Sequence, residues 1–392
     1  MENYKIYIKL FILIPLILIF FIIRIFKNFN INRIISHKIG HMTTPMEIYI
    51  CESKSDLKKI PTVWFFDKKI ANLFLKKKLS QKLFILPRQI LEPIYILFNK
   101  FKFFKFFLVD FSKETDEVKK AIYKGIKHID NKDVLLKYKP SIQFNDEEEA
   151  KGQHYLKKIG VQNEKFFGFV SRTSEFHNEK FETTRNSDIN DKIQGVKFLI
   201  SKGYKAIRMG KYETKKINWN ELNIIDYATS NDRCDFLDIY LTSKCKFLLS
   251  DSTGNTSVLN LFRKHCLTVN ECSIHTLEHH PEKLMILIKK FKNLHTNKIV
   301  SFEEAYKKKL NYIGSPHKLN ELGYEIIDNN EIEIKEATES YYDLINNNLN
   351  LNEIYQKQKN YWQNVEKYIG DRNKYKTIIC PNFYSKNKNL FE

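Results

Sequence analysis

Four short apolar runs divide residues 166–270: FFGFV (166–170), KAIRMG (205–210), KFLLSDS (246–252) and HCLTVN (265–270). Between them lie two stretches, 193–200 and 236–241, in which apolar residues recur at helical spacing. The first of these stretches stops at Gly203, a residue type that commonly ends helices. Strands and helices that alternate through short loops are typical of a parallel sheet with right-handed crossovers. The sequence therefore predicts an α/β fold centred on this segment.

Polar residues follow three of these predicted strands. Ser171-Arg172-Thr173 comes after the first strand, Arg208-Met209-Gly210-Lys211 after the second, and a loop over residues 250–257 after the third. Ligands of parallel α/β sheets bind outside the carboxyl ends of the strands. We therefore expect the three segments to meet at one edge of the sheet and to form a ligand site there.

The third loop is rich in hydroxyl groups and leads into a predicted helix at 258–262. A helix N-terminus exposes N–H groups and a partial positive charge, which suit a phosphate group. Arg172 and Arg208 would add charge-assisted, bidentate contacts. The alternative for each loop alone is structural: Ser252 and Thr253 only cap the helix, and Arg208 only forms an ion pair. Three such loops in one segment favour a phosphate or nucleotide site.

An ordered series of residues resembles a family of bacterial glycosyltransferases encoded with surface-polysaccharide genes. The series runs through Arg172, residues 185–188 (RNSD), 203–210 (GYKAIRMG), 226–230 (DYATS), 235–240 (DFLDIY) and 252–254 (STG). The resemblance is densest over about 165–272 and fades after about residue 340. It implies a GT-B-like fold with two Rossmann-like domains. In one departure from the family pattern, Val170-Ser171 stands where a His usually precedes the first Arg.

The resemblance implies a hexosyltransferase-like enzyme that needs no bound metal. A nucleotide-sugar donor would be held by the C-terminal domain, and the sugar would pass to a glycan or polyprenyl-linked acceptor. Together with the loops, it assigns donor binding to residues of the predicted sheet edge: Arg172, Arg208, Gly210, Asp238, Ser252, Thr253, Gly254 and Asn255. Arg172 is also a catalytic candidate, because a guanidinium group stabilises the charge that develops on the leaving diphosphate.

The N-terminal half contributes one catalytic candidate, His41, in the segment Ile39-Gly40-His41. In the family this segment begins the acceptor-side domain. A histidine titrates near neutral pH, so His41 suits a general base for an acceptor hydroxyl. The alternative is a structural histidine, and Glu47 is a weaker candidate for the same role.

The sequence predicts neither a metal site nor a cofactor other than the donor itself. Asp235 and Asp238 share a helical face, but nothing nearby completes a ligand set. His275 and His279 have helical i, i+4 spacing, although Pro281 argues against a continuing helix there. The six cysteines contain no CxxC pair, which fits reduced thiols.

Length and charge bound the remaining possibilities. The 392 residues suffice for two domains, and 43% hydrophobic with 14% aromatic residues describes a folded protein. A net charge of +19 suits nucleic acid, an anionic membrane or acidic substrates. The lysines are spread along the chain, and no nucleic-acid-binding motif is present. We therefore expect no nucleic-acid partner.

Two segments indicate a membrane. Residues 6–23 are apolar except for Tyr7 and Lys9, lack a cleavage site, and precede several basic residues. About 18 residues span roughly 27 Å, so this run predicts a single N-terminal transmembrane helix, with the bulk of the chain on the cytoplasmic face of the inner membrane. Residues 101–108 (FKFFKFFL) interleave aromatic rings with lysines, which suits either a membrane interface or an amphipathic core helix.

The predicted organisation has four parts: a membrane anchor at 1–30, an N-terminal acceptor-side α/β domain at 31–163, a C-terminal nucleotide-sugar-binding α/β domain at 164–340, and C-terminal helices with a tail at 341–392. The tail after Pro381 is polar and is expected to be mobile. The alternatives to a glycosyltransferase are another nucleotide- or phosphate-dependent transferase and an inactive membrane scaffold for polysaccharide assembly.

Overall fold

The computed structural model describes residues 14–15, 17–55, 60–108, 130, 132–161, 165–173, 183–211, 213, 215–219, 221–272, 274, 284–369 and 377–392. The chain forms two compact units, Met1–Ile142 and Gln143–Glu392. Both units contain parallel strands and helices, so the predicted α/β class is confirmed. The four-part division made from the sequence stays a prediction.

The first unit is built around two parallel strands, β1 (Asn30–Ile34) and β2 (Thr62–Phe66). Parallel bridges from Ile31 to Leu108 and from Trp64 to Ile85 extend the pairing on both sides, so β1 lies between β2 and Leu108. The run 82–87, which resembles a strand in sequence, contributes only the second bridge. The helical elements are α2 (Ile39–Ser55), α3 (Leu73–Ser80), α4 (Arg88–Lys100), α6 (Val134–Lys137) and the 3-10 helix η1 (Lys102–Phe107).

The second unit is organised by a seven-stranded sheet in the order β12-β8-β7-β6-β3-β4-β5. Every neighbouring pair in this sheet is parallel, as predicted from the alternation of strands and helices. The strands are β3 (Phe166–Val170), β4 (Lys205–Arg208), β5 (Ile224–Ile225), β6 (Phe247–Ser250), β7 (His265–Glu271), β8 (Leu284–Ile288) and β12 (Ile378–Ile379).

The strand order changes direction once, between β3 and β6. From β3 the chain proceeds to β4 and β5 on one side, then returns to β6 on the other side of β3 and continues outward. Such a topological switch point is where parallel α/β sheets bind ligands, outside the carboxyl ends of the strands. Val170 pairs with Ser250, so Ser171 and Asp251 lie side by side just beyond the two strand ends.

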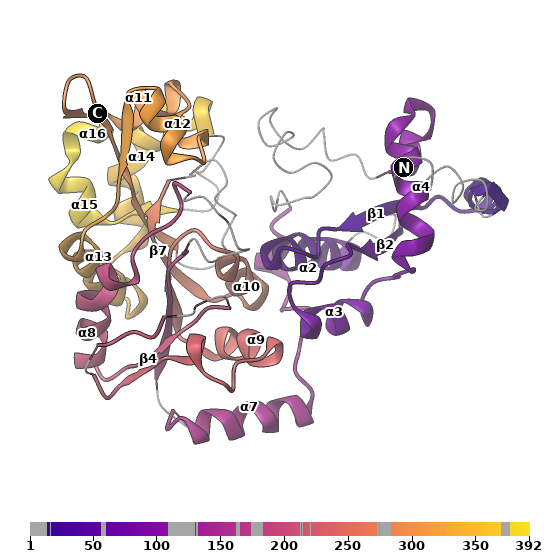
Figure 1. Cartoon of the computed structure of the whole chain (residues 1–392), viewed down its shortest axis with the longest axis horizontal. Coiled ribbons are helices and arrows are strands. Elements are labelled where there is room, and N and C mark those ends of the chain that lie inside the picture. Colours follow the sequence, from indigo (N-terminus) through magenta and orange to yellow (C-terminus); the bar gives the residue numbers. More distant parts are fainter. Residues whose placement is uncertain are drawn as a thin grey trace. The chain divides into compact units, whose positions relative to one another are not determined.

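Helices cover both faces of this sheet (Figure 1). On one face α8 (Ile193–Ser201) packs against α13 (Glu331–Ile345), and on the other α9 (Asp235–Lys244) contacts α10 (Gly254–Phe262) and α7 (Asp146–Lys158).

A second, antiparallel sheet follows β8 and was not expected from the sequence. Its order is β10 (Lys298–Ile299), β9 (Lys290–Asn293) and β11 (Tyr324–Ile327). The remaining elements are α11 (Phe302–Lys307), α12 (Pro316–Glu321), α14 (Leu351–Ile369), α15 (Pro381–Lys386), α16 (Lys388–Phe391) and the 3-10 helices η3 (Ile189–Lys192), η4 (Tyr227–Thr229) and η6 (Leu310–Tyr312).

The end of the chain is ordered, contrary to the expectation of a mobile tail. Helices α15 and α16 bury Phe383, Leu390 and Phe391. The ring of Phe391 lies 4.7 Å from that of Phe302 and 4.9 Å from that of Tyr361. These aromatic contacts outweigh the polar composition of the segment and hold it on the second unit.

The predicted transmembrane helix, and with it the location at the cytoplasmic face of the inner membrane, is wrong. Within the described part of the chain, none of the helices combines the length and the apolarity needed to cross a bilayer. Residues 6–13 and 16 of the apolar run lie outside that part. Residues 17–26 are helical, and their Phe20 is buried in the core of the first unit beside Phe29 and Phe107.

Candidate functional site at the carboxyl edge of the sheet

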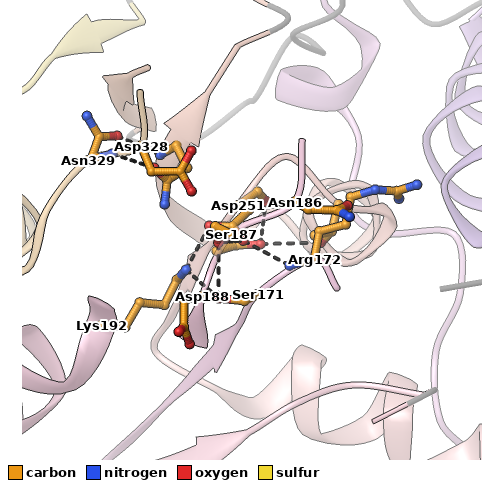
Figure 2. Close-up of polar contacts among 12 residues, drawn as sticks. Ser171, Arg172, Asn186, Ser187, Asp188, Lys192, Asp251, Asp328 and Asn329 are labelled. Atoms are coloured by element: carbon orange, nitrogen blue, oxygen red, sulfur yellow. Dashed lines mark hydrogen bonds and ion pairs between the residues drawn. The ribbon is translucent and has the colours of Figure 1, made fainter. Parts of the chain in front are cut away.

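A buried polar network occupies the switch point of the second unit (Figure 2). Its centre is Asp251, directly after β6, whose Oδ2 accepts hydrogen bonds from the backbone N–H of Arg172 at 2.9 Å and from Ser187 Oγ at 2.5 Å. Lys192 Nζ lies 2.7 Å from Asp251 Oδ1 and donates to Ser171 Oγ at 2.6 Å. The side chains of Lys192 and Asp251 are 0% exposed.

This network fixes the shape of the site. The Lys192 ammonium and both oxygens of the Asp251 carboxylate have partners of complementary charge or hydrogen-bonding type, which is the condition under which a buried ion pair is tolerated. It joins the ends of β3 and β6 to the start of α8. Figure 2 shows Lys192 and Arg172 on opposite sides of Asp251. The network therefore fixes the position of the Arg172 backbone just beyond the end of β3.

Next to the network lies the N-terminus of α10. Thr253 is its N-cap, and Thr253 Oγ1 accepts a hydrogen bond from the backbone N–H of Asn255 at 3.3 Å. Arg185 Nε donates to the carbonyl oxygen of Ser252 at 3.1 Å, which brings a guanidinium group to the loop. Residues 252–256 are half-buried. The capping role predicted as the structural alternative for Thr253 is thus present, at a helix end that remains accessible.

Arg208 lies at the end of β4 and is buried, with its side chain 4% exposed. Its guanidinium contacts carboxylates of this chain: Nη2 lies 2.9 Å from Glu213 Oε2, and Nη1 lies 3.2 Å from Asp226 Oδ2. Gly210 lies close to the same glutamate, because a Cβ there would stand 2.7 Å from Glu213 Cγ. In this structure Arg208 and Gly210 therefore contact Glu213 in the loop after β4, and Arg208 also contacts Asp226. The role of Arg208 and Gly210 in binding a donor stays a prediction.

Asp238, in the first turn of α9, also contacts groups of this chain. Its carboxylate accepts hydrogen bonds from Tyr227 Oη at 2.7 Å and Arg233 Nη1 at 3.0 Å. Burial raises the pKa of Asp238 to about 6, against the opposing effects of the Tyr227 hydrogen bond and the Arg233 charge. One turn earlier, Asp235 pairs with Lys211 at 3.0 Å, which ties α9 to the loop after β4. The predicted nucleotide contact of Asp238 is not tested by this geometry.

Buried polar residues also lie at the carboxyl ends of β7 and β8. Lys289, directly after β8, is buried, and its Nζ donates to the carbonyl oxygen of Asn186 at 2.7 Å and lies 2.7 Å from Asp328 Oδ1. Asn270 and Asn329 exchange two hydrogen bonds of 2.7 and 2.8 Å between backbone N–H and side-chain oxygen. Sequence reasoning placed Asp251 in the loop after the third strand but missed Lys192 and Lys289, because nothing in a local pattern indicates which residues a crossover brings together.

In the first unit, His41 lies in the first turn of α2 and is half-buried. A second histidine, His37, stands in the loop that joins β1 to α2. Its Nδ1 lies 2.8 Å from Oδ2 of Asp67, which directly follows β2. The His37 side chain is 41% exposed and that of Asp67 is 13% exposed. An accessible imidazole oriented by a carboxylate is suited to proton transfer.

Glu47, the weaker candidate from the sequence, has a structural environment. It is 1% exposed, and its Oε1 accepts a hydrogen bond from the backbone N–H of Ser141 at 2.9 Å. The Ser141 hydroxyl donates to the other carboxylate oxygen. These contacts join two ends of the first unit and leave Glu47 inaccessible to an acceptor.

As for metals, no group of three His, Cys, Asp or Glu side chains suited to holding an ion occurs among the residues described above. His275 and His279 lie outside the described residues.

Comparison with known proteins gives few matches. No protein-family model matches the chain, and no curated protein matches it. Among solved structures, it is similar to the ADP-heptose lipopolysaccharide heptosyltransferase II of E. coli, with 12% identity, a TM-score of 0.36, and 61% of this chain and 85% of that chain covered. A glycosyl transferase of family 9 from Veillonella parvula has 10% identity and a TM-score of 0.35, with 62% and 80% covered.

A third similar structure is the E. coli heptosyltransferase WaaC with ADP, with 12% identity, a TM-score of 0.34, and 61% of this chain and 86% of that chain covered. At these TM-scores the likeness carries no argument about activity. The functional argument rests on the residues of this chain.

Proposed function

We propose that the chain is a glycosyltransferase that moves a sugar from a nucleotide-sugar donor to a glycan or polyprenyl-linked acceptor in surface-polysaccharide biosynthesis. One observation carries the proposal: residues of the family-like series converge on a single topological switch point. Arg172 follows β3, residues 252–254 follow β6, and the Arg185 guanidinium contacts the carbonyl oxygen of Ser252. Such an edge is where parallel α/β sheets bind nucleotides.

We assign the diphosphate of the donor to the N-terminus of α10. The N-terminal end of the α10 dipole favours negative charge there, and Arg172 with Arg185 would neutralise it. As the bond between the anomeric carbon and the diphosphate oxygen breaks, the diphosphate leaves with the bonding electrons. Fixed donors stabilise this developing charge without a bound metal. Arg208, Gly210 and Asp238 would act by ordering the loops that border the donor.

The acceptor oxygen forms the new bond to the anomeric carbon and gives its proton to a base, which we assign to the first unit. His41 is the candidate from the sequence, and His37 is the candidate with an orienting carboxylate. Asp67 on Nδ1 leaves Nε2 of His37 as the proton acceptor and stabilises the imidazolium that forms. Removal of a positioned general base typically costs about 10²–10⁴-fold in rate.

The test is donor turnover by the full-length chain. UDP-, GDP-, ADP- and CMP-linked sugars are supplied with a polyprenyl phosphate or with water as acceptor, and the released nucleotide and the glycosylated product are measured. We expect turnover of one donor class, unchanged by a metal chelator. His37→Gln should lower the turnover about 10²–10⁴-fold, whereas His41→Gln should lower it less if His37 is the base.

The alternatives make different predictions in the same assay. Transfer of a phosphoryl group instead of a sugar would identify another nucleotide-dependent transferase. Nucleotide binding without turnover of any donor would identify an inactive scaffold.

The control for the histidine variants is His317→Gln. His317 is an exposed histidine in α12 of the second unit, so this substitution should leave the turnover unchanged.

A further inference from the structure

The helix at residues 17–26 of the first unit is apolar on both of its faces. Its inner face packs on the core through Phe20, with Ile17 and Phe21 partly buried beside it. Its outer face carries six apolar side chains that are 44–84% exposed: Leu18, Ile19, Ile22, Ile23, Ile25 and Phe26. At 3.6 residues per turn these six form one continuous arc opposite Phe20. A helix on the surface of a protein normally has polar residues on its outer side. We therefore expect this arc to be covered by an apolar partner.

Three exposed aromatic rings lie in or directly before η1, which contacts this helix at Phe21 and Arg24. Phe103 and Phe106 of η1 are 73% and 44% exposed, and the preceding Phe101 is 48% exposed. Arg24 joins the helix to η1, because its Nη2 donates to the carbonyl oxygen of Phe106 at 2.7 Å and its guanidinium lies 4.8 Å from the centre of the Phe106 ring. The six residues of the arc and these three rings together form what we name the apolar face.

The segments that form the apolar face carry positive charge, and this charge indicates which kind of partner the face binds. Segments 17–30 and 100–108 contain Arg24, Lys27, Lys100, Lys102 and Lys105 and no acidic residue. Lys27 and Lys100 are exposed. A second copy of the chain would place like charges opposite one another, which opposes self-association. Anionic lipid instead supplies both an apolar phase for the side chains and negative headgroups for the amines.

We propose that the apolar face docks the first unit on an anionic bilayer, with the helix lying along the headgroup boundary and not crossing the membrane. Among the described residues, this helix lacks the length and apolarity needed to cross a bilayer. Aromatic rings and basic side chains are the residue types that settle at this depth. The inference goes beyond glycosyl transfer, because the interaction needs neither donor nor acceptor and is tested without them.

The experiment is co-sedimentation of the full-length chain with vesicles of phosphatidylcholine alone or mixed with phosphatidylglycerol. We expect stronger binding to the mixed vesicles and release at high salt or by alkaline carbonate. The variant Ile22→Ser/Phe26→Ser should lower the partition coefficient more than about tenfold. Lys27→Gln and Lys100→Gln should each lower it about fivefold on the mixed vesicles.

The matched control is Ile332→Ser, which removes an exposed isoleucine, 66% accessible, from α13 of the second unit and should leave vesicle binding unchanged. All the substituted side chains are exposed, so the melting temperature should not change. Equal binding of wild type and Ile22→Ser/Phe26→Ser would overturn the proposal, as would resistance to alkaline carbonate. Self-association that this variant abolishes, with no vesicle binding by the wild type, would instead identify a second copy as the partner.

Discussion

Lys192 and Asp251 lie 59 residues apart in the sequence, yet their side chains form a fully buried pair. Removal of one partner would leave the other charge buried without compensation. We expect Lys192→Met to lower the free energy of unfolding by about 3–5 kcal/mol, measured by urea unfolding. Lys192→Met combined with Asp251→Asn should recover part of that loss, because no uncompensated charge then remains.

The control for this prediction is Lys244→Met, since Lys244 forms a partly exposed ion pair with Glu149. Exposed pairs contribute about 0–1 kcal/mol, so this substitution should have little effect. If Lys192→Met and Lys244→Met destabilised the protein equally, the buried pair would not hold the site together.

Asp238 makes the stability of the second unit depend on pH. Its pKa in the folded protein, about 6, lies above the value of 3.8 for a free Asp side chain. The folded state therefore binds this proton more tightly than the unfolded state, and the resulting stabilisation is full below about pH 3.8 and lost as the pH rises through about 6. The contribution of Asp238 protonation to the free energy of unfolding is at most about 3 kcal/mol.

Asp238→Asn removes this titration. We expect the free energy of unfolding of the wild type, minus that of Asp238→Asn, to decrease between about pH 5 and pH 7. Urea unfolding at several pH values measures the difference directly. A difference that is independent of pH would show that Asp238 does not titrate in this range.

Among the elements, α10 connects stability to ligand binding, because its cap lies at the proposed diphosphate site. Thr253→Ala removes the acceptor for the Asn255 N–H and should cost about 1 kcal/mol of unfolding free energy. Thr253→Ser keeps a hydroxyl and should retain most of the stability. If Thr253→Ser destabilised the protein as much as Thr253→Ala, packing of the Thr253 methyl group, and not the cap, would be the reason.

The elements of the second unit were largely predictable from periodicity. The runs at 166–170, 205–208, 247–250 and 265–271 are strands, and 351–369 is a helix, because each pattern is strong and closed by a recognisable end. The pairing within the antiparallel sheet β10-β9-β11 was not predictable, because β9 pairs with β11 across the intervening helices α11 and α12. Helices α15 and α16 were missed because aromatic contacts distant in sequence order them.

The meeting of the loops at the candidate site was predictable, but their internal contacts were not. The loops after β3 and β6 were found because topology alone brings strand ends together. The partners of Arg208 and Asp238 are carboxylates and hydroxyls of neighbouring loops, which a sequence pattern does not reveal. His37 was missed for the same reason, because its partner Asp67 lies 30 residues further along the chain, directly after β2.

The two units repeat one topological plan. In the first, β1 lies between β2 and Leu108, and in the second β3 lies between β4 and β6. In both, the first strand of the sheet is central and the chain later crosses to its other side. Each unit therefore has its own strand-end loops, with His37 and Asp67 in one and the Asp251 network in the other.

The central claim is that the switch point between β3 and β6 holds the donor's nucleotide. Hydrogen–deuterium exchange of the full-length chain, with and without UDP, GDP, ADP or CMP, tests it most directly. We predict that one nucleotide protects residues 171–173 and 251–257 and leaves the first unit unchanged, and that Arg172→Gln abolishes the protection while Arg88→Gln does not. Absence of protection with every nucleotide, or protection confined to other segments, would contradict the proposed donor site.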